Sequence, residues 1–81
     1  MIGPFDYSVI KRDTRFPIIC IYRHPSDYPD KFVARLFDMD SPTDVYEIAD
    51  TLIEIRQTIP PEMVRMERDP NDDPCIVEVF M

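Results

Sequence analysis

The sequence predicts an α+β fold in which a single helix packs on a mainly antiparallel sheet of four to five strands. Two observations lead to this prediction. Short runs rich in β-branched and aromatic residues alternate with proline-rich turns, and the block from Ser41 to Pro61 holds the clearest helix signal. The expected order of elements is strand, strand, short strand, helix, strand, strand. The 81 residues are expected to form one domain.

The N-terminal residues give the weakest structural signal. Tyr7, Val9 and Lys11 alternate before a charged segment, as in a short strand with one polar face. Residues 1–15 are therefore expected to form an arm or a short edge strand. The segment lacks the unbroken apolar stretch of a secretory signal, so a cytoplasmic location is expected.

A hairpin is predicted over residues 16–38. Residues 16–23 are rich in β-branched and aromatic side chains and are apolar on both faces, which is typical of a central strand. Residues 24–30 contain two prolines and several polar residues, so they are predicted to form a loop. Residues 31–38 return as the second strand of the hairpin.

Two helix starts compete in the next block. Ser41 followed by Pro42 would begin one long amphipathic helix. Alternatively, Thr51 and Glu54 form a capping box, which leaves Thr43–Ala49 as a short strand. The second start is favoured because a capping box would be redundant inside a continuous helix.

The end of this helix is set by two prolines. Pro60 disfavours the α conformation in the residue before it, so the helix is expected to stop by Ile59. Its apolar stripe is expected to lie on the sheet and consists of Leu52, Ile55 and Ile59, with Ile53 alongside.

Two more strands are predicted at residues 62–67 and 75–81, separated by an aspartate-rich and proline-rich turn at residues 69–74. The last strand is expected to be an open sheet edge, with only Glu78 and Pro74 to discourage pairing with another chain. A homodimer is therefore predicted, formed either by edge pairing or by packing of an uncovered sheet face. The alternative is that residues 1–15 fold over that face and make the protein a monomer.

The charge of the chain is negative and unevenly spread. Nine basic and 16 acidic residues give a net charge of −7. Residues 1–35 carry six cations and four acids, a balance of +2, whereas residues 36–81 carry three cations and twelve acids, a balance of −9. An acidic half repels the phosphates of nucleic acid and attracts a basic protein surface. Direct binding to nucleic acid is thus disfavoured, and so is a membrane span, since charged residues interrupt every apolar run.

No catalytic, metal-binding or nucleotide-binding motif is complete. Asp38 and Asp40 after an apolar strand resemble the first motif of the haloacid-dehalogenase-type phosphotransferases, but 81 residues cannot build the large sheet of those enzymes. Cys20 and Cys75 lie in apolar runs and are expected to pack in the core. We therefore expect no enzymatic activity and no cofactor. An alternative is a small-molecule or metal site that uses the acidic loop 38–44.

The leading hypothesis is a non-enzymatic, acidic protein-binding module. Its expected partner is a basic protein surface that normally holds nucleic acid, and its expected effect is inhibition. The expected contact residues are the aspartates of two acidic segments, namely Asp38, Asp40, Asp44, Asp69, Asp72 and Asp73.

Two resemblances bear on this hypothesis. In size, acidity and lack of a catalytic motif the chain is similar to phage and mobile-element proteins that inhibit host nucleic-acid-handling enzymes, including anti-CRISPR proteins. Residues 32–58 resemble the HicB-like antitoxins, in which a three-stranded sheet leads into a helix that begins like residues 49–55. The glycine-rich connection and the DNA-binding tail of that family are missing. The first resemblance implies an anti-defence inhibitor, and the second implies an antitoxin component.

Overall fold

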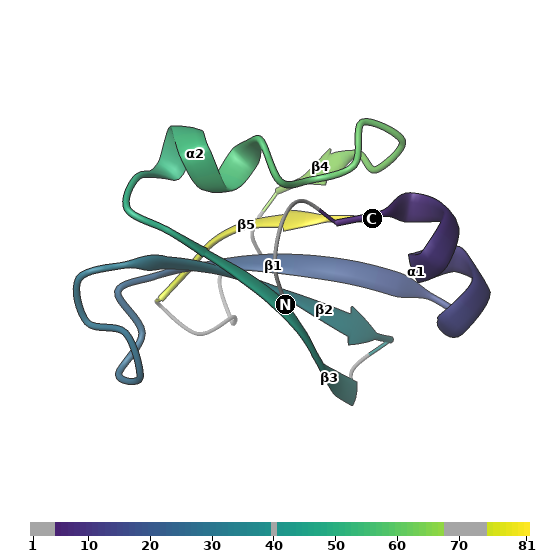
Figure 1. The fold of residues 1–81 in the computed structure, drawn as a ribbon, viewed down its shortest axis with the longest axis horizontal. Helices are drawn as coiled ribbons and strands as arrows, with labels where there is room; N and C mark the ends of the chain where they lie inside the picture. The colour runs from purple at the N-terminus through teal and green to yellow at the C-terminus, as the bar shows by residue number, and fades with distance from the viewer. Residues whose placement is uncertain (1–4, 40, 68–74) are drawn as a thin grey trace.

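The chain folds into one antiparallel sheet with two short helices on the same face (Figure 1). We describe residues 5–39, 41–67 and 75–81 from a computed structural model. The strands follow the order β3-β2-β1-β5-β4. The elements in chain order are α1 (Tyr7–Asp13), β1 (Pro17–Arg23), β2 (Phe32–Asp38), β3 (Ser41–Ala49), α2 (Leu52–Arg56), β4 (Arg65–Met66) and β5 (Ile76–Phe80). The predicted α+β class is confirmed with five strands, whereas the expectation of a single helix is wrong.

The helix that the sequence did not indicate is α1, which replaces the short strand expected near the N-terminus. Asp6 caps it, because its carboxylate accepts the backbone N–H of Ser8 at 3.0 Å. Ile10 is buried in the core, and Tyr7 packs against the same core from three residues earlier. The weak alternation of Tyr7, Val9 and Lys11 therefore did not indicate a strand. The face that packs on the core is defined by the three-residue spacing of Tyr7 and Ile10, which is a helical spacing.

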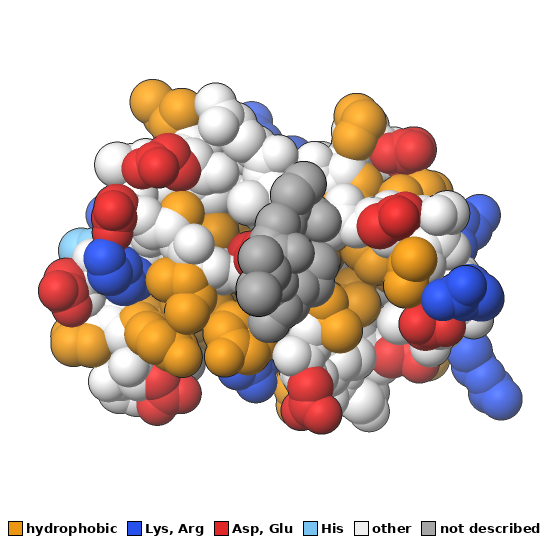
Figure 2. Space-filling view, viewed as in Figure 1, with side chains coloured by type: hydrophobic (Ala, Val, Ile, Leu, Met, Phe, Trp, Pro, Cys, Tyr) orange, Lys and Arg blue, Asp and Glu red, His pale blue; other side chains and the backbone are white. Residues whose placement is uncertain are grey.

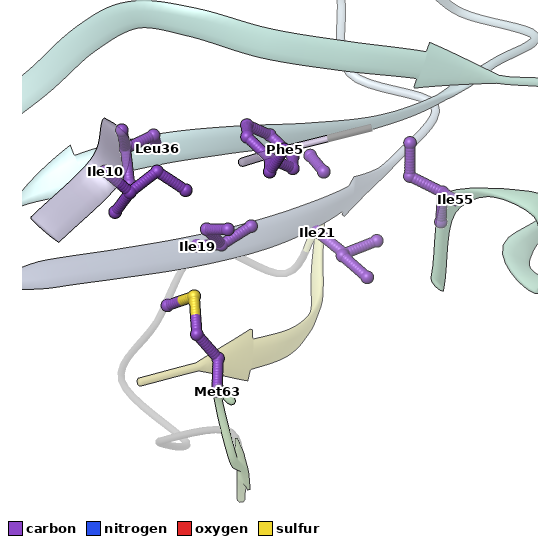
Figure 3. Packing of buried hydrophobic residues seen from close by; sticks show 8 residues of the cluster. Phe5, Ile10, Ile19, Ile21, Leu36, Ile55 and Met63 are labelled. Carbon is purple, nitrogen blue, oxygen red and sulfur yellow. The ribbon is translucent and has the colours of Figure 1, made fainter. Parts of the chain in front are cut away.

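Strand β1 is central, as its apolar residues predicted, and it pairs with β2 on one side and β5 on the other. Ile19 and Ile21 are completely buried and face the helices. Figure 3 shows the two isoleucines surrounded by side chains from α1, from α2 and from the turn before β4. The alternate residues of β1 point to the opposite face of the sheet.

Strand β3 is an edge strand of nine residues, so a long helix from Ser41 is excluded. The strand carries three features that discourage pairing with another chain. Pro42 lacks a backbone N–H, the pairing register with β2 shifts between Arg35 and Phe37, and the Glu47 side chain is buried on the core side.

The predicted cap of α2 is confirmed. The N–H of Glu54 donates to the Thr51 hydroxyl at 3.2 Å, and that hydroxyl donates to the Glu54 carboxylate at 3.0 Å. The helix ends at Arg56, which agrees with the expectation that it stops by Thr58 or Ile59. Ile55 is completely buried, whereas Ile53 is 68% exposed. The expectation that Ile53 packs beside the apolar stripe is wrong, because residues two apart point to different sides of a helix.

The C-terminal strands differ from the prediction in length and in position. Only Arg65–Met66 of the expected strand 62–67 forms β4, since Met63 turns into the core instead. Strand β5 lies between β1 and β4, so the expectation that it is an open edge is wrong. The predicted turn at residues 69–74 falls entirely outside the described residues.

Two buried carboxylates occupy the core side of the sheet in opposite electrostatic settings. Glu78 accepts two hydrogen bonds from Arg56, both at 2.8 Å, and one from Arg65 at 3.0 Å. Hydrogen bonding by Arg56 first, and by Arg65 next, lowers the pKa of Glu78. Burial raises the pKa of Glu47, which has no hydrogen bond within the described residues. Glu78 thus joins α2 and β4 to β5, whereas the charge on Glu47 opposes folding.

Replacing Ile55 by alanine should lower the free energy of unfolding by about 2–5 kcal/mol, because the completely buried side chain would leave a cavity beneath α2. Ile53→Ala on the same helix is the matched control and should change stability by less than about 0.5 kcal/mol. Urea unfolding followed by circular dichroism measures both. Equal losses would contradict the orientation of α2.

Thr51→Ala should cost about 1 kcal/mol, because the N–H of Glu54 would lose its acceptor at the helix start. Ser41→Ala provides the comparison, since Ser41 is exposed at the beginning of β3 and caps no helix. Urea unfolding should therefore rank Thr51→Ala as the more damaging change. The reverse ranking would speak against the observed helix boundary.

Glutamine in place of each buried glutamate should give opposite results. The pKa of Glu78 is lowered on folding, so its stabilisation exists above the unfolded pKa and is lost as pH falls through the folded pKa. Glu78→Gln should thus cost about 1–3 kcal/mol at pH 7 and less in acid.

The pKa of Glu47 is raised on folding, so its favourable contribution exists below the unfolded pKa and is lost as pH rises through the folded pKa. Glu47→Gln should therefore stabilise the protein at pH 7 but not at pH 4. Urea unfolding at both pH values tests this, and parallel responses would contradict it.

Candidate functional site

Two of the six predicted contact residues lie among the described residues. Asp38 ends β2, and its carboxylate accepts the backbone N–H groups of Arg15 and Phe16, each at 3.1 Å. Asp38 therefore holds the start of β1 in place. Asp44 is exposed on β3 and shares no hydrogen bond or ion pair with Asp38. The other four, Asp40, Asp69, Asp72 and Asp73, lie outside the described residues.

Three further carboxylates gather around Lys31 at one end of the sheet. Lys31 pairs with Asp50, which is the main reason that the pKa of Lys31 is raised, and Asp30 and Glu54 add to the effect. Asp30 and Lys31 belong to the β1–β2 loop, whereas Asp50 and Glu54 belong to the turn before α2 and to α2. Figure 2 shows acidic side chains on its left side, where this end of the sheet lies.

These carboxylates continue along the edge of the sheet to Asp44. Asp44 and Asp50 are six residues apart, which corresponds to about 20 Å of extended strand. We call the four exposed residues Asp30, Asp44, Asp50 and Glu54 the acidic margin.

Sequence reasoning selected only Asp44 from the acidic margin. The other members are not part of an aspartate-rich segment, so they gave no motif. The antiparallel pairing of Phe32 with Ala49 brings the β1–β2 loop next to the turn before α2. A correct pairing of β2 with β3 was the one signal that would have found them.

The second candidate surface is the sheet face opposite the helices, which we call the open face. Most of its side chains are apolar, and the charged side chains of Arg35, Asp27 and Glu67 also line it. Its members follow from the pairing register of the five strands and are Ile18, Cys20 and Tyr22 of β1, Val33, Arg35 and Phe37 of β2, Pro42, Asp44, Tyr46 and Ile48 of β3, Met66 of β4, and Ile76 and Val79 of β5.

Two adjoining hollows lie on the open face and share Tyr22 and Phe37. The first, of about 290 Å³, is also lined by Tyr28 of the β1–β2 loop, by Asp27 and by Arg35. The second, of about 520 Å³, is lined mainly by aliphatic and sulfur-containing side chains, with Glu67 as its charged member. Side chains of this kind favour contact with an apolar surface.

Polar groups at the first hollow are used by neighbouring side chains. The Arg35 guanidinium lies 5.4 Å from the centre of the Tyr46 ring. Hydrogen bonding to Tyr46 raises the pKa of Tyr28, which links the β1–β2 loop to β3. Arg35 forms no ion pair with a carboxylate within the described part of the chain.

Neither a metal-binding cluster nor a membrane-spanning helix is found among the described residues. In residues 5–39, 41–67 and 75–81, no group of three or more histidine, cysteine, aspartate or glutamate side chains is placed to hold a metal ion. The two described helices are too short to cross a membrane. Cys20 and Cys75 are both thiols and are half-buried, with Cys20 on the open face.

Comparison with known proteins identifies no relative. No protein-family model, curated protein or solved structure matches this chain. The basis for assigning a function is therefore the charge and the surface geometry of the chain itself.

Proposed function

We propose that this chain is a non-enzymatic, acidic protein-binding module that docks on a basic protein surface which normally holds nucleic acid. The acidic margin is the observation that carries the proposal. Its four carboxylates are exposed along one edge and one end of the sheet, and one of them, Asp50, pairs with Lys31. A surface of this kind attracts a cationic groove and repels nucleic acid.

The fold uses some carboxylates and leaves others for a partner. Asp38 and Glu78 are hydrogen-bonded inside the structure, to backbone N–H groups and to arginines respectively. Asp44 makes no hydrogen bond or ion pair within the described residues. Because Asp44 does not serve the fold, its charge is free to act on a partner.

The length of the acidic margin suits a nucleic-acid-binding groove. Such a groove presents lysine and arginine side chains at the positions of successive phosphates. A margin that extends over about 20 Å can face several of these cations at once. Its presence there would exclude the nucleic acid, so the expected consequence is inhibition of the partner. In this proposal, Asp40, Asp69, Asp72 and Asp73 keep their predicted role as additional contacts.

Two alternatives remain predictions. The HicB-like antitoxin role rests on the resemblance of residues 32–58. The small-molecule or metal role rests on the acidic loop 38–44, in which Asp38 is engaged by the backbone and Asp40 lies outside the described residues. The acidic margin does not depend on either role.

The proposal predicts a salt-sensitive complex with a nucleic-acid-binding protein. The tagged chain is used to capture proteins from the cells that encode it, and the captured protein is then purified and titrated. Binding should weaken steeply between about 0.05 and 0.3 M salt, because exposed charges are screened over this range. Duplex DNA or RNA should compete with the chain for the same surface.

A matched pair of variants tests the surface itself. Asp44→Asn with Asp50→Asn should weaken the complex about 3- to 30-fold, because two exposed contact charges are removed. Asp13→Asn with Glu62→Gln changes the net charge equally, at exposed positions outside the acidic margin, and should have little effect. Equal losses for the two pairs, salt-insensitive binding, or capture of no nucleic-acid-binding protein would overturn the proposal.

A further inference from the structure

We propose that two copies of this chain pack face to face through the open face, forming a homodimer whose layers are helices, sheet, sheet and helices. The open face places apolar side chains in water around its second hollow. Met39 is 60% exposed, and Met66 and Met81 are each 44% exposed. A sheet that is apolar on both faces is normally covered on both.

The open face is large enough for a stable interface. The molecule measures 31 × 28 × 20 Å, and the sheet extends along the two longer dimensions. Specific interfaces bury about 800 Å² on each partner, which a face of this size can supply. Two sheets that pack through such faces lie about 10 Å apart, with their strands roughly aligned.

Edge pairing is a poorer route to the same dimer. Strand β3 is protected by Pro42, by the irregular pairing after Arg35 and by the buried charge of Glu47. The opposite edge is β4, which has only two residues. The face, rather than either edge, is therefore the surface that a second copy covers.

The centre of the open face is Cys20. This residue is in the middle of β1, and β1 is the middle strand of the sheet. A two-fold axis through the centre of the face brings the Cys20 side chains of the two copies together, whether the axis runs along the strands or across them. The neighbours of Cys20 in the ladder are Arg35 on β2 and Val79 on β5.

Charge selects the direction of the axis. If the axis runs across the strands, β2 of one copy packs on β2 of the other. The two Arg35 guanidinium groups then face each other, and the repulsion between their like charges is unfavourable. An axis along the strands lays β2 of one copy over β5 of the other. Arg35 then faces Val79 of the second copy, on the side of the sheet that carries Glu67. Arg35 of one copy then approaches Glu67 of the other, and their opposite charges attract. We therefore infer that the axis runs along the strands.

Sedimentation equilibrium from low to several hundred micromolar protein tests the dimer. The wild-type chain should show a dimer that tightens as salt is added, because each copy carries a net charge of −7. This response is opposite to the one expected for the acidic margin, so failure of the dimer and failure of the proposed function are distinguishable. A monomer mass over the whole concentration range would overturn the inference.

Arginine substitutions test which surface forms the dimer interface. Val79→Arg should raise the dimer dissociation constant about tenfold or more, because it buries a cation opposite Arg35. Ile53→Arg introduces the same charge on the exposed side of α2 and should leave the dimer unchanged. Met66→Arg is the second interface variant, at a position already 44% exposed, for use if Val79→Arg does not fold. Equal dissociation by the interface and control variants would overturn the assignment.

Chemical crosslinking tests the position of the axis. A short bifunctional maleimide should link two wild-type chains and two Cys75→Ser chains through Cys20. The Cys20→Ser chain should give no dimer band, although it should sediment as the wild type does. A dimer band that persists in Cys20→Ser, or that is lost in Cys75→Ser, would show that the axis does not pass through the centre of the open face.

Discussion

Strand β1 must be covered on both faces, and the arrangement of the other elements follows from this constraint. Its Ile19 and Ile21 side chains are completely buried, beneath residues that come from α1, α2 and the turn before β4. Neither helix is long enough to cover the sheet alone, so two short helices share one face. The alternate side chains of β1 form the middle of the open face. The two described helices cover one face of the sheet, and we propose that a second copy covers the other.

The buried carboxylates of this fold and its exposed carboxylates have different surroundings. Glu78 is held by Arg56 and Arg65, which joins three elements at the core side of the sheet. Glu47 is buried without such partners among the described residues, and it keeps an edge strand from pairing. Buried charges of this kind contribute more to choosing one arrangement than to net stability. In the acidic margin, Glu54 accepts the Thr51 hydroxyl and Asp50 pairs with Lys31, whereas Asp44 makes no hydrogen bond or ion pair within the described residues.

The two proposed surfaces are compatible with each other. The open face lies on one side of the sheet, whereas Asp30, Asp50 and Glu54 lie at one end of the sheet and Asp44 lies at the β3 border of the open face. A dimer formed through the open face would therefore keep two acidic margins at its periphery. Two linked binding surfaces bind a partner with two basic sites more tightly than either does alone, provided that the geometry allows both to engage.

The sequence by itself determined the features that depend on residues close together in the chain. The two apolar faces of residues 16–23 identified the central strand, and the Thr51 hydroxyl marked the start of α2, because periodicity and capping act over a few positions. Only the tertiary structure decided the order of the strands, which places β5 inside the sheet, and the meeting of Asp30 with Asp50 and Glu54 around Lys31. Of the acidic margin, Asp44 alone was predicted. Contacts between distant residues depend on which strands pair, and pairing is fixed by burial of the whole core rather than by any local pattern.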